Sequence, residues 1–381
     1  MSKEKIDIQN FTFADILAPM TQEEFFRDYY DKQPLHIPGA ASKFAGVMNW
    51  EVLNRLLNMN AIWTDKSLCV VMDRKIVAPP SYCSEEIDRN GNAVLRPVAA
   101  RVMELCRHGA SLAINDIDTL TPEIAAVVGA FEKELTVKGQ CNLYCSWQQR
   151  QAFQSHYDTH DVFAIHFEGE KVWRVWETRM PHPIQHRRYK ALGEEFDVKN
   201  RGKVLMEVTM KPGDLLYIPR GWYHDALSSS GGCIHIAFGM TGIIGLDMLT
   251  TITDMAVDRQ IFRQNLPRAS EGRAALKARL RQLAAELGEI AESDAYLDAF
   301  EAYQADWHYE RGGFDLPVAA KEREFEVTDP SLQVVQRGGQ WGLVGAKGAV
   351  PIPPGYEGPL KWVLAAKRFP RSSFTTEHAA M

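Results

Sequence analysis

The chain has few cysteines, and they are scattered. None of the six belongs to a Cys-x-x-Cys pair; they stand at Cys69, Cys83, Cys106, Cys141, Cys145 and Cys233. A disulfide framework or a zinc ribbon needs cysteines at paired, characteristic spacings, so we expect neither. We interpret the six as reduced thiols, most of them buried.

Two further absences narrow the class of protein. No run approaches the roughly 18 to 20 consecutive apolar residues that cross a bilayer, and the first residues lack the apolar core of a signal peptide. We therefore expect a cytoplasmic protein with no membrane partner. The 43 Lys and Arg residues against 49 Asp and Glu residues give a net charge of −6. This charge offers a phosphate backbone no overall attraction, so we expect no direct nucleic-acid binding.

What the chain does contain is the composition of a folded protein, with 45% apolar and 24% charged residues among 381. Its patterns predict three regions. Residues 1–250 mix short helical and strand-like runs, as in an α+β domain with outer helices. Residues 251–313 are predicted to be helical, and residues 314–381 have the strand and helix content of a winged-helix-sized unit.

Two helices can be placed from side-chain spacing. Thr21 and Glu24 form a capping-box pattern, which predicts a helix that ends near Lys32 because a proline follows two residues later. The second helix has leucines at steps of four, three and four, at Leu276, Leu280, Leu283 and Leu287. This apolar face must pack on its own domain or on a second copy of the chain, and we expect a homodimer.

The most informative segment, Ser155 to Phe167, carries three potential metal-binding side chains at alternate positions: His156, Asp158 and His160. We expect a strand here, and alternation along a strand places the three on one face. His156 and Asp158 can then converge on one metal ion, and a third ligand must come from elsewhere. We interpret His160 as a group that makes a local hydrogen bond.

The third ligand is offered by residues 211–224, Lys-Pro-Gly-Asp-Leu-Leu-Tyr-Ile-Pro-Arg-Gly-Trp-Tyr-His. Pro-Gly-Asp predicts a turn, Leu-Leu-Tyr-Ile a strand, and Pro-Arg-Gly a second turn that delivers His224 at the start of the next strand. Two histidines and one carboxylate form the facial triad that holds Fe(II) and leaves positions open for a cosubstrate and O₂. A structural zinc site would instead close its shell with four protein ligands.

With these motifs the sequence resembles the cupin-type JmjC oxygenases, and most closely the ribosomal oxygenase group of Fe(II)- and 2-oxoglutarate-dependent protein hydroxylases. The likeness covers nearly the whole chain, from Lys-Gln-Pro-Leu-His-Ile at residues 32–37 through the metal motif to the terminal regions. It implies an α+β fold: a double-stranded β-helix (jelly-roll, JmjC/cupin) barrel with outer helices. A helical dimerisation segment and a winged-helix-like C-terminal unit would follow the barrel.

The resemblance also assigns site residues. The metal ligands of the family fall on His156, Asp158 and His224, and its basic residue that pairs with the distal carboxylate of 2-oxoglutarate falls on Lys171. A lysine pairs as a single charge, whereas an arginine grips a carboxylate with two hydrogen bonds. The animal histidyl hydroxylases of the group have Lys at this position and the bacterial arginyl hydroxylase has Arg, so this chain departs from the bacterial pattern.

Further contacts with the cosubstrate are implied at three positions. An Asn and a Tyr of the lysine-containing members fall on Asn142 and Tyr144, which are two residues apart and so face the same side of a strand. His235, in the strand-like run at residues 233–238, is a further candidate for the interior of the barrel near the cosubstrate.

The function implied by the resemblance is the hydroxylation of a protein or peptide side chain, by analogy an arginine or histidine of a ribosomal protein. Fe(II), 2-oxoglutarate and O₂ would be required. Three alternatives stay open: a hydroxylase that tailors a small peptide natural product, an N-methyl-lysine demethylase, and a non-enzymatic metal-binding cupin that acts as a sensor. The residues Lys171, Asn142 and Tyr144 argue against the sensor.

Overall fold

The computed structural model describes residues 11–147, 154–190, 192–228, 231–312, 323–346 and 348–378. The chain divides into two compact units, Met1–Gly312 and Gly313–Met381, and each is described by itself. The further boundary expected near residue 250 lies inside the first unit and stays a prediction. No helix in the described part of the chain is long and apolar enough to cross a membrane.

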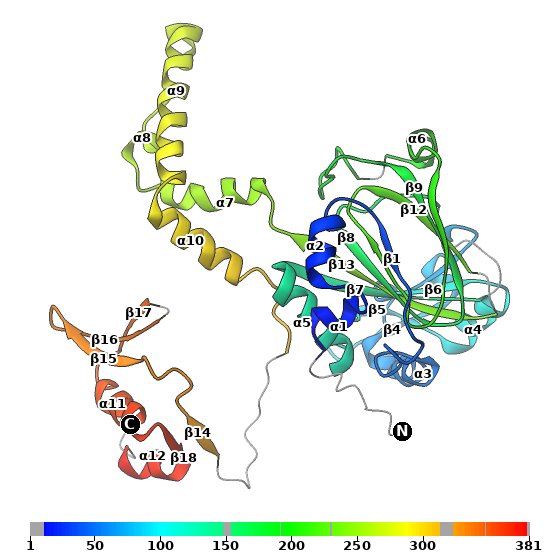
Figure 1. Ribbon diagram of the computed structural model, residues 1–381, viewed down its shortest axis with the longest axis horizontal. Helices are drawn as coiled ribbons and strands as arrows, with labels where there is room; N and C mark the ends of the chain where they lie inside the picture. The colour runs from blue at the N-terminus through cyan, green and yellow to red at the C-terminus, as the bar shows by residue number, and fades with distance from the viewer. Residues whose placement is uncertain are drawn as a thin grey trace. The chain divides into compact units, whose positions relative to one another are not determined.

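The larger sheet of the first unit has eight strands among the described residues, in the order β1-β11-β8-β13-β7-β6-β2-β3, and all neighbours are antiparallel (Figure 1). The strands are β1 (Leu35–Ile37), β2 (Leu68–Met72), β3 (Lys75–Ile76), β6 (Ser111–Ile114), β7 (Val137–Ser146), β8 (Asp161–Glu168), β11 (Leu215–Ile218) and β13 (Cys233–Gly242). Strand β13 lies between β7 and β8, so His235 faces Tyr144 on one side and His166 on the other.

A second sheet of three strands, in the order β10-β9-β12, faces the larger one. Its strands are β9 (Lys171–Arg179), β10 (Val204–Met210) and β12 (Trp222–Ser228). Val162, Leu216 and Ile218 from the larger sheet pack with Trp173 and Val175 from the smaller one in a shared apolar core. The two sheets therefore form the walls of a jelly-roll barrel. The predicted strand that contains Leu-Leu-Tyr-Ile is confirmed as β11.

The outer face of the larger sheet is covered by helices. They are α1 (Phe13–Leu17), α2 (Gln22–Asp28), α3 (Trp50–Leu57), α4 (Ala99–Arg107) and α5 (Pro122–Leu135). Strand β7 shows how the sheet separates two environments: Cys141, Leu143 and Cys145 are buried against these helices, while the residues between them face the barrel interior. On the same outer side Phe131 of α5 lies 4.5 Å from Phe163 of β8, measured between ring centroids.

Helix α2 begins as predicted, with the capping box of Thr21 and Glu24 formed in both directions. The prediction that it runs to near Lys32 is wrong, because the α-helix ends at Asp28. Asp31 adopts a positive φ of 55°, a left-handed conformation that a right-handed helix cannot contain.

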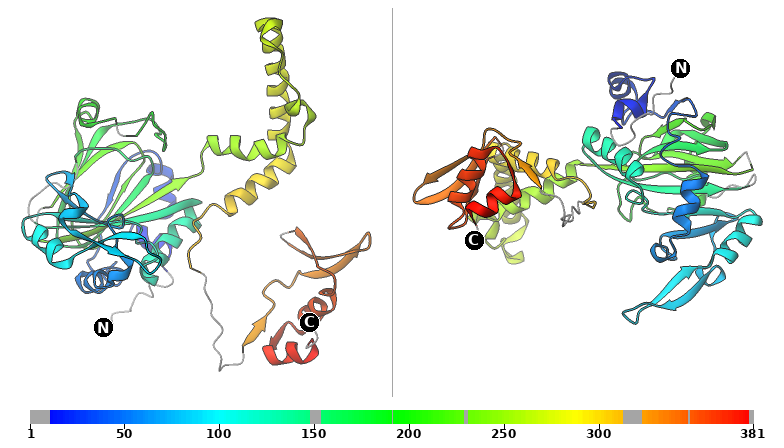
Figure 2. Two further views of the ribbon diagram at one scale, coloured as in Figure 1. Left: turned by 180° about the vertical axis from the view of Figure 1, so that it is seen from behind. Right: turned by 90° about the horizontal axis from the view of Figure 1, so that it is seen from below.

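Shorter elements complete the barrel region. They are the hairpin strands β4 (Cys83–Ile87) and β5 (Ala93–Pro97), the helix α6 (Glu194–Asn200), and the 3-10 turns η2 (Asn60–Ile62) and η3 (Pro79–Ser81). The β4–β5 hairpin projects from the body of the unit (Figure 2).

A helical segment follows the barrel. It contains α7 (Gly245–Ala256), α8 (Gln260–Arg263), the 3-10 turn η4 (Ala269–Glu271), α9 (Gly272–Ala291) and α10 (Asp294–Ala305), so the helices predicted here are present. Ile252, Ile290 and Tyr296 bury one another where α7, α9 and α10 meet. Towards the start of α9 the leucine face has no such cover among the described residues of this unit, and Leu276 and Leu280 are 38% and 50% exposed.

The second unit is small. Its strands are β14 (Glu324–Glu326), β15 (Gln333–Arg337), β16 (Gln340–Gly345), β17 (Gly348–Pro351) and β18 (Arg368–Pro370), and its helices are α11 (Glu357–Ala366) and α12 (Arg371–Glu377). Strands β15, β16 and β17 form one antiparallel sheet, and β14 pairs with β18. The predicted strand and helix content is present, while the likeness to a winged helix stays a prediction.

Candidate metal centre

The three predicted metal ligands lie together inside the barrel. One ligand atom from each of His156, Asp158 and His224 lies within 4.8 Å of the other two. His156 and His224 form an isolated antiparallel bridge, with N···O distances of 3.1 and 2.8 Å in the two directions. The bridge brings residues 68 positions apart, 156 and 224, to the same point.

The prediction that strand alternation aligns these residues is wrong. His156 takes part only in that bridge, and Asp158 and His160 lie in the loop before β8. The loop is instead fixed from outside, because Gly221 N–H donates to the Asp158 carbonyl at 2.8 Å. Gly221 has a φ of 88°, and a Cβ there would lie 2.1 Å from the Met180 carbonyl oxygen, so a glycine is required.

Hydrogen bonds to the backbone fix the tautomer of both imidazoles, those of His156 and His224. The Nδ1 atom of His156 is 2.8 Å from the Gln154 carbonyl oxygen, and that of His224 is 3.0 Å from the Trp222 carbonyl oxygen. A carbonyl oxygen only accepts, so each Nδ1 carries the hydrogen and each Nε2 keeps its lone pair. The Nε2 atom of His224 lies 3.5 Å from a carboxylate oxygen of Asp158.

Electrostatics favour the forms that bind a metal. Burial, and then the neighbouring His156, lowers the pKa of His224 to about 4, so this imidazole is neutral at pH 7. For Asp158, burial raises the pKa, but the imidazoles of His160, His156 and His224 outweigh burial and the net shift is downward. The site therefore presents an ionised carboxylate beside a neutral imidazole donor.

The triad borders an inner cavity of about 200 Å³. All the predicted cosubstrate contacts line it with the triad: Asn142, Tyr144, Lys171 and His235. Tyr144 and His235 stack with their ring centroids 5.0 Å apart, and Asn142 makes a side-chain hydrogen bond with Tyr144. Burial raises the pKa of Tyr144 to about 12, so the phenol keeps its proton at neutral pH.

Lys171, the first residue of β9, is the buried cation of this cavity. Burial lowers its pKa, and the opposing contributions come from the thiols Cys233 and Cys145 rather than from a carboxylate. None of the ion pairs among the described residues involves Lys171. A buried ammonium without an anionic partner is costly, so this cavity suits an anionic ligand.

Gln140 and Trp173 are among the residues of the inner cavity that were not predicted. Gln140 is on the same face of β7 as Asn142 and Tyr144, so alternation by two positions would have found it. Trp173 lies two residues beyond Lys171 on β9, where the same rule applies. The Nε1 atom of Trp173 and the Nδ1 atom of His235 are buried without a hydrogen-bond partner.

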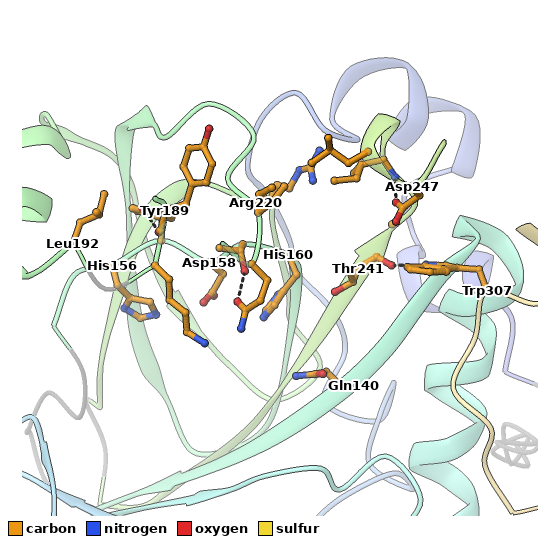
Figure 3. A pocket seen from close by; sticks show the side chains of 18 of the residues that line it. Gln140, His156, Asp158, His160, Tyr189, Leu192, Arg220, Thr241, Asp247 and Trp307 are labelled. Atoms are coloured by element: carbon orange, nitrogen blue, oxygen red, sulfur yellow. Dashed lines mark hydrogen bonds between the residues drawn. The ribbon is translucent and has the colours of Figure 1, made fainter. Parts of the chain in front are cut away.

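A larger cleft of about 790 Å³ opens on the other side of the triad. It shares four lining residues with the inner cavity: Gln140, His156, Asp158 and His160. Figure 3 shows Tyr189 and Leu192 on one side of these residues and Thr241, Asp247 and Trp307 on the other. The two cavities therefore meet at the metal centre.

His160 narrows this meeting point. A Cβ added to Gly239 of β13 would lie 2.9 Å from the His160 ring, so the glycine leaves the space that the imidazole occupies. The His160 Nδ1 atom is 3.1 Å from the Asp161 carbonyl oxygen, the local hydrogen bond that the sequence predicts.

A jelly-roll barrel with two histidines and one carboxylate inside it defines the cupin class of metal-binding proteins. Residues 121–247, which include all the residues of the triad and the inner cavity, match the JmjC domain family. Residues 121–247 thus form a JmjC domain, and the chain is similar to proteins of the ribosomal-oxygenase type, as the sequence motifs predict.

The relatives and solved structures agree with this assignment. The chain is 23% identical over 312 residues to human ribosomal oxygenase 1, covering 75% of this chain and 46% of that protein. It is 24% identical over 224 residues to the bifunctional lysine-specific demethylase and histidyl-hydroxylase NO66 of Drosophila persimilis, covering 58% and 30% of the two chains. The chain thus spans less than half the length of either relative.

Among solved structures, the chain is similar to YcfD, a ribosomal oxygenase from Escherichia coli. The TM-score is 0.51 at 16% sequence identity, covering 93% of this chain and 91% of that one. At this identity the likeness concerns the fold, and it confirms the predicted jelly-roll core.

Proposed function

We propose that the protein is an Fe(II)- and 2-oxoglutarate-dependent dioxygenase that hydroxylates a side chain of a protein or peptide. The observation that carries the proposal is the position of the triad, at the junction between a small cavity with a buried lysine and a large open cleft. A chelating cosubstrate can reach the metal from the first and a target side chain from the second.

The donor set fits Fe(II). Two imidazole nitrogens and one carboxylate oxygen would hold the ion, and this is the donor set of the Fe(II) oxygenases that leave positions open for other ligands. When bound, iron and 2-oxoglutarate supply the chemistry that uses O₂ to convert an unactivated C–H bond to C–OH. His156 and His224 contribute orientation, because their Nδ1–H bonds to the backbone leave both Nε2 lone pairs available for the ion that they would hold.

The inner cavity fits the cosubstrate. The ammonium of Lys171 pairs with the far carboxylate of 2-oxoglutarate, which relieves the burial of an uncompensated charge. Asn142 and Tyr144 hold the same carboxylate from β7. The unpartnered ring nitrogens of Trp173 and His235 offer further hydrogen bonds once the ligand is present.

The substrate proposed is a ribosomal-protein side chain, an arginine or a histidine. Its support is the names of the relatives, ribosomal oxygenase and histidyl-hydroxylase, together with an outer cleft large enough for a polypeptide segment. Lys171 stands where the histidyl hydroxylases have lysine and the arginyl hydroxylase has arginine, so it favours a histidine as the target residue. We place the protein in the cytoplasm and expect no direct contact with nucleic acid or membrane.

Demethylation of N-methyl-lysine is a second candidate, because the name of one relative includes it. The same site would hydroxylate the N-methyl carbon, and the unstable product would release formaldehyde. Tailoring of a small peptide natural product would use the same chemistry on another substrate. Incubation with ribosomal proteins and with methyl-lysine peptides separates these reactions: a mass gain of one oxygen indicates hydroxylation, and formaldehyde indicates demethylation.

The direct test is an anaerobic titration of the metal-free protein with Fe(II) and 2-oxoglutarate. We expect the visible charge-transfer band of an iron-chelated 2-oxoglutarate in the native protein and its loss in His224→Ala, which removes one of the three ligands. Absence of the band from the native protein would refute the proposed function and leave a cupin that binds some other ligand.

The same titration tests the role of Lys171. A hydrogen bond to a charged group contributes roughly 1.5 to 3 kcal/mol, so Lys171→Ala should weaken 2-oxoglutarate binding roughly 10- to 100-fold. The matched control is Lys211→Ala, which removes a lysine that is 64% exposed in the turn before β11. This substitution should leave the affinity for 2-oxoglutarate unchanged. An equal affinity in Lys171→Ala and Lys211→Ala would show that another group binds the far carboxylate.

A further inference from the structure

A segment outside the JmjC match closes one side of the outer cleft. Residues 307–311, which follow α10 and which we call the docking arm, return from the helical segment to the barrel. Its two aromatic residues, Trp307 and Tyr309, line the cleft that opens onto the metal centre. Figure 3 shows Trp307 at one side of this cleft.

Arg311 fixes the end of the docking arm. Its Nε donates to Asp118 and its Nη1 to Glu132, both at 2.6 Å, and its Nη2 donates to the Gly139 carbonyl. The side chain is only 14% exposed, and the two carboxylates are about equally covered. A covered guanidinium bound by two carboxylates and a carbonyl holds its backbone far more firmly than a surface ion pair does.

Trp307 fixes the start of the docking arm. Its Nε1–H donates to the Thr241 carbonyl at 3.0 Å, at the end of β13. The Nζ atom of Lys138 lies 4.1 Å from the Trp307 ring centroid and 5.5 Å from that of Tyr309. A cation over both rings fixes their positions in addition to the hydrogen bond.

The docking arm therefore presents two aromatic side chains to the cleft: Trp307, which a hydrogen bond holds, and Tyr309, whose ring centroid lies 5.5 Å from the Lys138 ammonium. Fixed aromatic groups are efficient binding surfaces, because they bury a large area and lose little conformational freedom when a partner arrives. The volume of the cleft, about 790 Å³, is also several times that of the inner cavity. The cleft is therefore larger than one target side chain requires.

We infer that the docking arm binds the polypeptide on either side of the target residue, so that the substrate is an extended peptide segment and not a free amino acid. Trp307 and Tyr309 contact the peptide, and Arg311 is a positioning residue that holds them in place. The inference rests on the proposed function, since it assigns the substrate side of the same metal centre.

The test uses the full chain loaded with Mn(II) and 2-oxoglutarate, so that bound peptides are not turned over. A displayed library of random 12-residue peptides is selected on the native protein, and the affinity of an enriched peptide is then measured for each variant. We expect Arg311→Ala to weaken binding at least tenfold. Asp118→Asn, which keeps the side-chain shape and removes one ionic partner of Arg311, should weaken it less.

Arg259→Ala is the matched control, because Arg259 forms ion pairs within the helical segment and lies away from the cleft. The Fe(II) and 2-oxoglutarate charge-transfer band is recorded for every variant. Loss of peptide affinity with the band retained separates a substrate-binding role from general unfolding. Should Arg311→Ala fail to fold, Asp118→Asn carries the test.

Two results would overturn the inference: no peptide enriched on the native protein, or equal peptide affinity in the native protein, Arg311→Ala and Asp118→Asn. Failure of the proposed function would be visible separately, as the absence of the charge-transfer band from the native protein.

Discussion

The two histidines of the metal centre owe their ligating form to backbone carbonyls. The Nδ1 atoms of His156 and His224 are hydrogen-bonded to the main-chain oxygens of Gln154 and Trp222. Substitution of the Gln154 or Trp222 side chain therefore leaves the tautomer of each histidine unchanged. The imidazoles depend instead on the path of the backbone, which the bridge between His156 and His224 fixes. At this site the side chains supply the ligand atoms, and the path of the backbone determines how those side chains are oriented.

Another histidine, His166 of β8, makes folding depend on pH. It is fully buried, its Nε2 donates to the Gly169 carbonyl at 3.0 Å, and its Nδ1 has no partner. Burial, and then the charge of Lys171, lowers its pKa to about 4. Between pH 6.5 and 4 the unfolded chain binds a proton here that the folded chain does not, so stability falls as the pH falls.

The expected loss through His166 is about 3 kcal/mol by pH 4, from a pKa difference of about 2.5 between the unfolded and folded chains. His166→Gln can still donate to Gly169 and has no proton to gain. Its free energy of unfolding, measured with urea at several pH values, should decrease less than that of the native protein from pH 7 to 4.5. His182→Gln, at an exposed loop histidine, is the control. Equal pH dependence in His166→Gln and the native protein would show that His166 is not responsible.

At the scale of elements, α5 supports the strand that carries Asn142 and Tyr144. The side chain of Thr121 accepts a hydrogen bond from Ile124 N–H at 3.2 Å and caps the helix, which packs Val128 and Phe131 against the barrel. Loss of such a cap costs about 1 kcal/mol.

Thr121→Ala should therefore lower the free energy of unfolding by about 1 kcal/mol, as measured by urea denaturation at pH 7. Thr121→Ser retains the hydroxyl and should recover most of the loss. Were Thr121→Ala as stable as the native protein, the cap would contribute nothing and packing alone would hold α5 in place.

Elements with a regular period could be predicted from the sequence, and irregular ones could not. Turn residues and apolar runs identified β11 and β13, and with β13 the strand that carries His235, whereas Lys171 was assigned by the family resemblance. The route of Asp158 to the metal was missed because a loop has no period, and its position depends on a hydrogen bond from Gly221. The docking arm was missed for a related reason: Arg311 and Asp118 are 193 residues apart, and no local pattern relates them.

At the scale of the whole molecule, α9 has an apolar face that the described residues of its own unit do not cover. Its later part packs through Leu287 and Ile290 against α7 and α10, whereas Leu276 and Leu280 remain exposed. Exposed leucines in one row of a helix indicate a surface that a second helix covers. We propose that a second copy of the chain covers this row and that the protein is a homodimer.

The double variant Leu276→Glu/Leu280→Glu tests this proposal. A dimer interface across α9 would have to bury four carboxylates in the double variant, two from each chain, so the variant should be a monomer of 43.0 kDa where the native protein has twice that mass by light scattering. Ile87→Glu, at a residue 67% exposed on the β4–β5 hairpin, is the control and should remain a dimer. The metal centre lies in the barrel, so the variant should keep the Fe(II) and 2-oxoglutarate band. A native protein that is monomeric at every concentration, or a double variant that stays dimeric, would exclude α9 as the interface.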